Sequence, residues 1–181
     1  MTGRPAAGDH GPGGQAAAEY AIRAARPDDL DAIAGFEVEI ALASFGAEAI
    51  TDPQLHRRRV AGALGKPGEI AIVAVPARGR NGGTADAPVG WAWLSARTNS
   101  LTGARYGNFR SLAVADLPER SKIGEMLMTE ILAAAARAEF TQLTGKVNAA
   151  NLGMRTLYRA FGFTATHITM EKRLGHPPDS P

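Results

Sequence analysis

The sequence predicts an α/β protein, in which one mixed sheet is flanked by helices. Strand-length runs of β-branched and alternating apolar residues recur along the chain. Segments with helical apolar spacing separate them, in the order strand, helix, helix, three strands, helix, strand, helix, strand. The chain has 181 residues, of which 45% are hydrophobic. This is enough to form one sizeable buried core.

The first half of the expected domain begins after a segment rich in Gly, Ala and Pro. We expect residues 1–18 to be disordered, and the domain to span 19–174. Residues 20–25 alternate as in a strand. Pro27, followed by Asp28 and Asp29, is typical of a helix start. The inward-facing positions expected on this helix and on a second one over 53–64 are Leu30, Ile33, Ala34, Val38, Leu42, Leu55, Val60 and Leu64.

The remaining elements follow from apolar runs separated by turn-forming residues. Strands are expected over 69–75, 89–95 and 106–114, and an alanine-rich helix over 123–140. A short strand at 142–147 and a helix at 152–161 come next. A closing strand is expected over 163–173, before a flexible tail at 175–181.

Composition excludes several classes of site. There is no cysteine, so disulfides, thiolate nucleophiles and cysteine metal sites are excluded, and the four scattered histidines do not predict a metal centre. No run of 18 apolar residues predicts a membrane span, and the N-terminal segment lacks the apolar core of a secretory signal. We therefore expect a cytoplasmic protein with no membrane partner.

The charge distribution is mildly asymmetric. Residues 1–100 carry 10 basic and 11 acidic residues, a net −1, and residues 101–181 carry 10 and 7, a net +3. The second half can thus accommodate an anionic ligand, but its charge does not require nucleic acid.

The most specific stretch is residues 147–163. It resembles the N-x-x-A-x-x-L-Y-x-x-x-G-F signature of the GNAT superfamily of acyl-CoA N-acyltransferases, with Met154 in place of the alanine. The matching residues are Asn151, Leu157, Tyr158, Gly162 and Phe163. The resemblance covers 20–174 in element order. It implies a GNAT fold with six to seven strands, about four helices and a strand splay at the donor site.

The resemblance also implies site residues. Tyr158 would protonate the leaving thiolate, and Asn151 would reach the pantetheine arm of acetyl-CoA. Alternatively, Tyr158 packs beside neighbouring phenylalanines and Asn151 caps a helix. The backbone of Leu112, Ala113 and Val114 would pair with pantetheine, and the splay would separate their strand from the one after Phe163. With no activated Ser motif visible, we expect direct attack by the amine.

The pyrophosphate loop of the family departs from its pattern here. By position, the Q/R-x-x-G-x-G/A motif is Glu119, Arg120, Ser121, Lys122, Ile123 and Gly124, and only Gly124 fits. The helix start still offers N–H groups and a dipole to phosphate. Three interpretations stay open: a variant acetyl-CoA site, another donor such as aminoacyl-tRNA or a carrier-protein thioester, or a non-catalytic binding module. Contacts for tRNA would be Arg120, Lys122, Arg155, Arg159 and Arg57 to Arg59, although such arginines are more often solvated.

The acceptor side is less defined. The strand at 106–114 lacks a carboxylate base, because its nearby positions are Asn108 and Arg110. A base in the helical region would come from Glu37, Glu39, Asp52 or His56. Otherwise a chain of water molecules would take the proton of the acceptor, or an acceptor amine of low pKa would need no strong base. Aromatic walls of the acceptor pocket would come from Phe36, Phe45, Trp91, Trp93 and Tyr106, some of which must be core. Arg97 and Arg110 would hold an acidic group on a small-molecule amine.

The sequence does not fix the oligomeric state, and a homodimer stays open because members of the family often form one.

Overall fold

The computed structural model describes residues 19–77, 87–170 and 172. The chain divides into two compact units, residues 1–145 and 146–181. Within the described residues, no helix is both long and apolar enough to cross a membrane.

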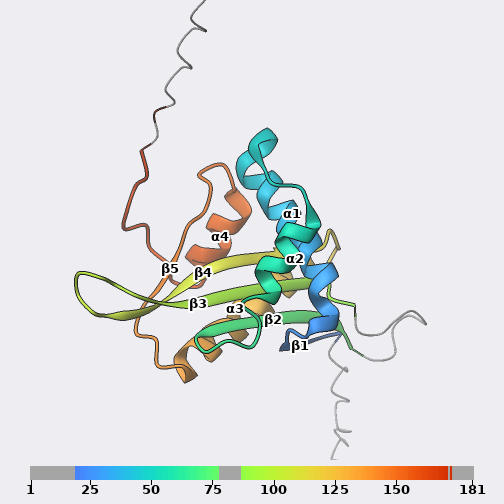
Figure 1. The fold of residues 1–181 in the computed structure, drawn as a ribbon, viewed down its shortest axis with the longest axis horizontal. Coiled ribbons are helices and arrows are strands. Elements are labelled where there is room, and N and C mark those ends of the chain that lie inside the picture. The colour runs from blue at the N-terminus through green and yellow to red at the C-terminus, as the bar shows by residue number, and fades with distance from the viewer. Residues whose placement is uncertain (1–18, 78–86, 171, 173–181) are drawn as a thin grey trace, which may run out of the picture. The chain divides into compact units, whose positions relative to one another are not determined.

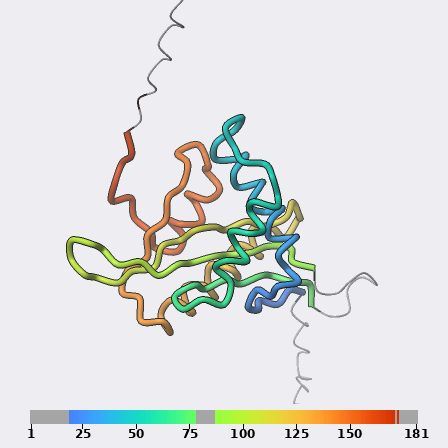
Figure 2. The backbone as a smooth tube through the Cα atoms, in the orientation of Figure 1, coloured from blue at the N-terminus to red at the C-terminus, as the bar shows by residue number. Residues whose placement is uncertain are grey.

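The first unit is built on one mixed sheet. Its strands are β1 (Tyr20–Ala24), β2 (Glu69–Pro76), β3 (Gly90–Thr98), β4 (Arg105–Val114) and β5 (Leu143–Gly145). They lie in sequence order, the first four antiparallel, with β5 parallel to β4. The β3–β4 hairpin reaches beyond the rest of this sheet (Figure 2). The sheet thus has five described strands, fewer than the six to seven expected.

Helices cover both faces of this sheet (Figure 1). Helices α1 (Leu30–Phe45) and α2 (Pro53–Ala61) lie on one face, and α3 (Arg120–Arg137) lies on the other. On the first face, Leu30, Ile33, Phe36 and Val60 pack with Val73, Val75, Trp91 and Trp93. On the second, α3 buries Ile123, Leu127, Met128 and Ile131. These two apolar layers fix the sheet between the helices.

Two predicted inward positions are wrong. Leu42 is 47% exposed and Leu55 is 46% exposed, whereas His56 is buried. On α2 the buried residues are His56 and Val60, which are four apart and therefore share one face of the helix. Asp52 caps the start of this helix by accepting a hydrogen bond from the Gln54 amide at 2.9 Å.

The second unit contains α4 (Leu152–Ala160). The Asn151 side chain accepts a hydrogen bond from the Met154 amide at 3.0 Å, so it caps the helix as the sequence predicts. Gly162 ends it with a positive φ of 79°, a conformation that favours glycine. The expected closing strand is wrong where it can be judged, because residues 163–170 and 172 adopt no regular structure. Residues 171 and 173 lie outside the described part.

Candidate active site

One edge of β4 is open over half of its length. Strand β5 pairs with β4 only from Gly107 to Phe109, and residues 110–114 have no strand partner on that side among the described residues. The expected neighbour after Phe163 is therefore replaced by β5, which precedes α4. Leu112, Ala113 and Val114 lie on this open edge. Unpaired backbone groups at such an edge can hydrogen-bond an extended ligand.

The start of α3 offers free backbone donors. Helix α3 begins at Arg120, so residues 120–124 form its first turn and the beginning of the second. The Arg120 amide donates to Leu117 O and the Ile123 amide to Glu119 O, each at 3.0 Å. Within the described residues, no backbone carbonyl accepts from the amides of Ser121 or Lys122. Free amides at the positive end of a long helix suit an anionic group.

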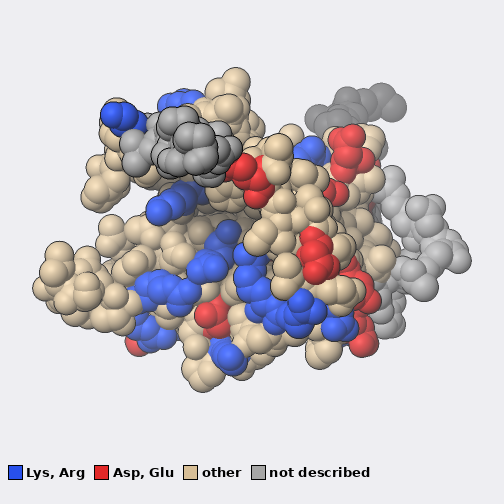
Figure 3. Space-filling model, turned by 45° about the horizontal axis from the view of Figure 1, so that its top comes forward, with Lys and Arg blue, Asp and Glu red and all other residues tan. Residues whose placement is uncertain are grey.

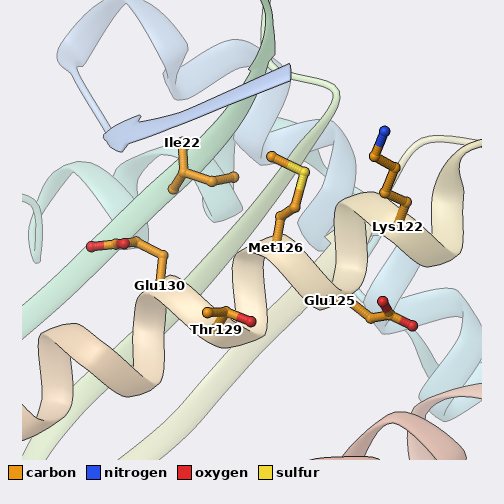
Figure 4. A pocket seen from close by; sticks show the side chains of 6 residues that line it. All are labelled: Ile22, Lys122, Glu125, Met126, Thr129 and Glu130. Carbon is orange, nitrogen blue, oxygen red and sulfur yellow. The ribbon is translucent and has the colours of Figure 1, made fainter. Parts of the chain in front are cut away.

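The side chain of Lys122 leads away from this turn toward β1. Its Nζ lies 3.7 Å from a carboxylate oxygen of Glu19, and the side chain lines a shallow pocket beside Ile22 and Met126. Figure 4 shows it extending toward the β1 side of α3. The bulk at this position, where the family has glycine, therefore lies on the β1 side of the helix.

A bulge separates two halves of the β3–β4 pairing. Trp93 pairs with Ser111, whereas Leu94 pairs with Phe109, so Arg110 has no opposite residue. An extra residue of this kind turns its side chain out of the normal alternation. The Arg110 guanidinium carbon lies 5.1 Å from the Trp93 ring centroid. Strand β4 also loses its β5 partner at this residue.

The Trp93 indole is held by its polar edge. Its Nε1–H donates to a Glu69 carboxylate oxygen at 2.6 Å, and the Ser95 hydroxyl donates to the same oxygen. Arg59 of α2 contributes a second guanidinium, with its carbon 5.9 Å from the ring centroid. Figure 3 shows Lys and Arg side chains gathered next to one another on one face of the molecule.

Arg59 is anchored by a buried carboxylate. It donates to Glu37 of α1, whose side chain is 3% exposed, while Arg59 itself remains 47% exposed. The second carboxylate oxygen of Glu37 has no hydrogen-bond partner within the described residues. Partial burial lowers the pKa of Arg59, and the positive charge of Arg110 lowers it further.

The other predicted acceptor residues are divided between the core, the end of α1 and the β3–β4 hairpin. Phe36 is buried in the core, and Phe45, at the end of α1, is 67% exposed. Arg97 and Tyr106 face each other across the β3–β4 pairing. Within the predicted set, Trp93 contacts Arg110, packs with Phe36 in the core cluster, and has its ring centroid 5.8 Å from that of Trp91.

Sequence reasoning missed Arg59 and Glu69 as partners of Trp93. Arg59 stood in a run of three arginines that indicated a solvated surface. Glu69, an acid opening an apolar strand run, was a usable signal, but its partner depends on strand register.

The four candidate bases have distinct surroundings. His56 donates from Nε2–H to Ile50 O at 2.7 Å, and Asp52 caps α2. Glu39 is exposed, and Glu37 is held by Arg59. Of these carboxylates, Glu37 is the one in contact with the Trp93 cluster through Arg59.

Tyr158, in the second unit, is buried on α4. Its side chain is 9% exposed, and its ring centroid lies 4.8 Å from that of Phe163. Burial raises the pKa of this phenol to about 12, so it is protonated and neutral at ordinary pH.

A fold of this kind can host many different activities, so the class of this protein rests on its sequence family. The family model described as Acetyltransferase (GNAT) family matches residues 39–163. The chain therefore belongs to the GNAT family, and it is an acyltransferase.

Solved structures agree with this fold. A variant of the BH1408 protein from Bacillus halodurans is 16% identical, with a TM-score of 0.72, covering 85% of this chain and 99% of that one. An acetyltransferase from Trypanosoma brucei is 15% identical, with a TM-score of 0.60, covering 86% and 99%. An aminoglycoside acetyltransferase from an uncultured soil metagenomic sample, in complex with sisomicin, is 15% identical, with a TM-score of 0.60, covering 88% and 97%.

A search of curated proteins finds no match. In the part of the chain that the structure describes, no group of three or more His, Asp or Glu side chains is placed to hold a metal ion.

Proposed function

We propose that this enzyme transfers an acetyl group from acetyl-CoA to the amine of a small molecule by direct attack. The observation that carries the proposal is the open β4 edge followed by the free amides at the start of α3. In the transfer, the amide N–C bond forms and the thioester C–S bond breaks. The sulfur gains a proton and the amine loses one.

The donor would be held by backbone groups. The open edge at Leu112, Ala113 and Val114 suits an extended arm with amide groups, such as pantetheine. The turn from Arg120 to Gly124, with the amides of Ser121 and Lys122, suits the pyrophosphate. Acetyl-CoA supplies the activated acyl group. The fit is partial at Glu119, whose acid replaces the Arg or Gln of the family.

Tyr158 is proposed as the acid that protonates the leaving sulfur. Its support is the motif match and a phenol that is protonated at ordinary pH. Asn151 is proposed to reach the donor arm. Its side-chain oxygen already caps α4, which leaves its amide NH₂ group as a donor.

Two other functions remain as alternatives. An aminoacyl-tRNA or carrier-protein thioester donor would fit the departure from the family pattern at Glu119 and Lys122. A non-catalytic binding module would retain ligand binding without turnover.

Calorimetric titration with acetyl-CoA, followed by a thiol-release assay on an amine panel, tests these functions. A Kd tighter than roughly 100 μM, about −5.5 kcal/mol, together with amine-dependent thiol release, is expected. Absence of acetyl-CoA binding with uptake of charged tRNA would favour the second function. Binding of acetyl-CoA without release from any amine would favour the third.

A further inference from the structure

Two arginines share one aromatic ring on the α1–α2 face of the sheet. Arg59 and Arg110 both lie within 6 Å of the Trp93 centroid, a distance typical of cation–π contact. They come from α2 and β4, so the fold, and not a local run of sequence, places them together. They are close enough for the charge of Arg110 to act on the pKa of Arg59.

The two charges are balanced unequally. Arg59 has the buried carboxylate of Glu37 as its partner. Arg110 is exposed, and within the described residues it makes no ion pair. Glu69 brings a second negative charge close to the ring, but among the described residues it forms no ion pair with either arginine, and one of its oxygens accepts from Trp93 and Ser95. The cluster thus holds two guanidiniums near each other with only one direct carboxylate partner. An anion beside them would relieve their repulsion.

The cluster is also preorganised. The indole is fixed by its bond to Glu69, Arg59 is fixed by Glu37, and Arg110 is aimed by the β-bulge. A guanidinium offers several N–H donors in a plane, which match carboxylate and phosphate oxygens. Little side-chain ordering would then be needed when an anion binds.

We propose that the acceptor carries an anionic group, a carboxylate or a phosphate-type group, on the same molecule as its amine. Arg110, together with Arg59, binds that group beside the Trp93 indole. This inference rests on the proposed function for the role of the amine, but not for the binding of the anion. Arg110 lies two to four residues before Leu112–Val114 on the open edge, roughly 7 to 13 Å along a strand.

Matched acceptors test the inference. Each α-amino acid of a panel is paired with its carboxamide, and 2-aminoethylphosphonate is paired with ethanolamine. For each pair, kcat/KM for the charged acceptor is divided by kcat/KM for its neutral partner, at saturating acetyl-CoA. This ratio is measured for the wild type, Arg110→Gln, Arg110→Lys and a control, Arg137→Gln. Arg137 is an exposed arginine of α3 that is paired with Glu130.

We expect the wild type to prefer one class of anionic acceptor by roughly 10- to 100-fold, the usual effect of a hydrogen bond to a charged group. Preference for the amino acids identifies a carboxylate, and preference for the phosphonate identifies a phosphate-type group. Arg110→Gln abolishes the preference, Arg110→Lys keeps part of it, and Arg137→Gln leaves it intact.

A second readout works without turnover. Thermal shifts without acetyl-CoA should show that the preferred anionic amine stabilises the wild type and not Arg110→Gln. If this holds but no amine is acetylated, the anion site stands and the proposed function fails. Equal use and equal binding of charged and neutral acceptors would overturn the inference. So would an Arg110→Gln variant that weakens acetyl-CoA binding and leaves acceptor preference unchanged, because Arg110 would then serve the donor.

Discussion

The Tyr158 hydroxyl is the group on which the proposed chemistry depends most. Tyr158→Phe removes the proton donor and keeps the ring contact with Phe163. We expect kcat to fall by about 100-fold or more, within the usual range for general acid catalysis. Calorimetry should show that acetyl-CoA affinity changes by less than about threefold. An unchanged kcat would remove Tyr158 from the mechanism.

The same phenol predicts a pH dependence. The pKa of Tyr158 is about 12 in the folded protein, against about 10 in an unfolded chain. The folded state therefore holds the proton more tightly, and the stability associated with it is complete below pH 10 and lost as pH rises toward 12. The free energy of unfolding of the wild type, measured with urea, should therefore fall between pH 10 and pH 12. The free energy of unfolding of Tyr158→Phe should fall less over the same range. An equal fall in both proteins would contradict a raised pKa at Tyr158.

Asp29 stabilises the start of α1. It is buried, it accepts two hydrogen bonds from Arg23 at 2.7 and 2.8 Å, and it accepts one from the Arg26 amide at 2.7 Å. Burial alone would raise the pKa of Asp29, but the bonds to Arg23 and Arg26 outweigh it and lower the pKa. Its stabilisation is thus present above about pH 4 and lost as pH falls below that value.

Asp29→Asn should lower the free energy of unfolding by about 3 kcal/mol at pH 7, because it leaves a partly buried guanidinium without its carboxylate. Urea unfolding should show the difference from wild type shrinking as pH falls below 4. Asp31→Asn is the control, since its pair with Arg57 is exposed, and it should cost less than about 1 kcal/mol. Equal effects would show that burial of the pair does not matter.

At the level of the elements, a close approach at Gly107 of β4 is where the pairing with β5 begins. A Cβ atom on Gly107 would collide with Leu143 of β5, and it would lie 3.1 Å from atoms of Leu94 and Phe140. The missing side chain therefore lets β5 pair with β4, just before the edge opens at Arg110.

Gly107→Ala should destabilise the protein by about 1 to 3 kcal/mol through overpacking. Gly35→Ala is the matched change: Gly35 lies within α1, and a Cβ there would meet nothing within 4 Å. It should stabilise the protein by about 1 kcal/mol, because alanine favours the helix. Thermal unfolding of both variants checks the pair. A neutral Gly107→Ala would show that β5 can shift without cost.

For the whole molecule, the net charge is a modest +2. The salt dependence of donor binding can therefore tell a coenzyme from a nucleic-acid carrier. A coenzyme offers few phosphates, so its binding should weaken gently with salt. Titration between 50 and 200 mM salt should therefore lower acetyl-CoA affinity by about tenfold or less. A donor bound through contacts to six or more phosphates would lose roughly 1,000-fold in affinity over the same range. A loss of that size would favour a nucleic-acid carrier.

Features that depend on near neighbours in the chain could be predicted from the sequence. The strand and helix order, the Asn151 cap, the Gly162 terminus and the family motif each depend on short spacings along the chain. The buried face of a helix was harder to predict. Leu55 and His56 are adjacent, but His56 is buried because it lies on the same helix face as Val60. The strand expected at 163–173 had suitable residues, but a strand also needs a partner.

The sequence by itself determined the class of protein, because the family motif and the element order are written in local spacing. Only the tertiary structure decided which distant side chains meet. Arg59 and Arg110 reach Trp93 because helix docking and a one-residue bulge bring three elements together. Strand register and bulges depend on pairing between segments far apart in the chain, and no local pattern encodes that pairing.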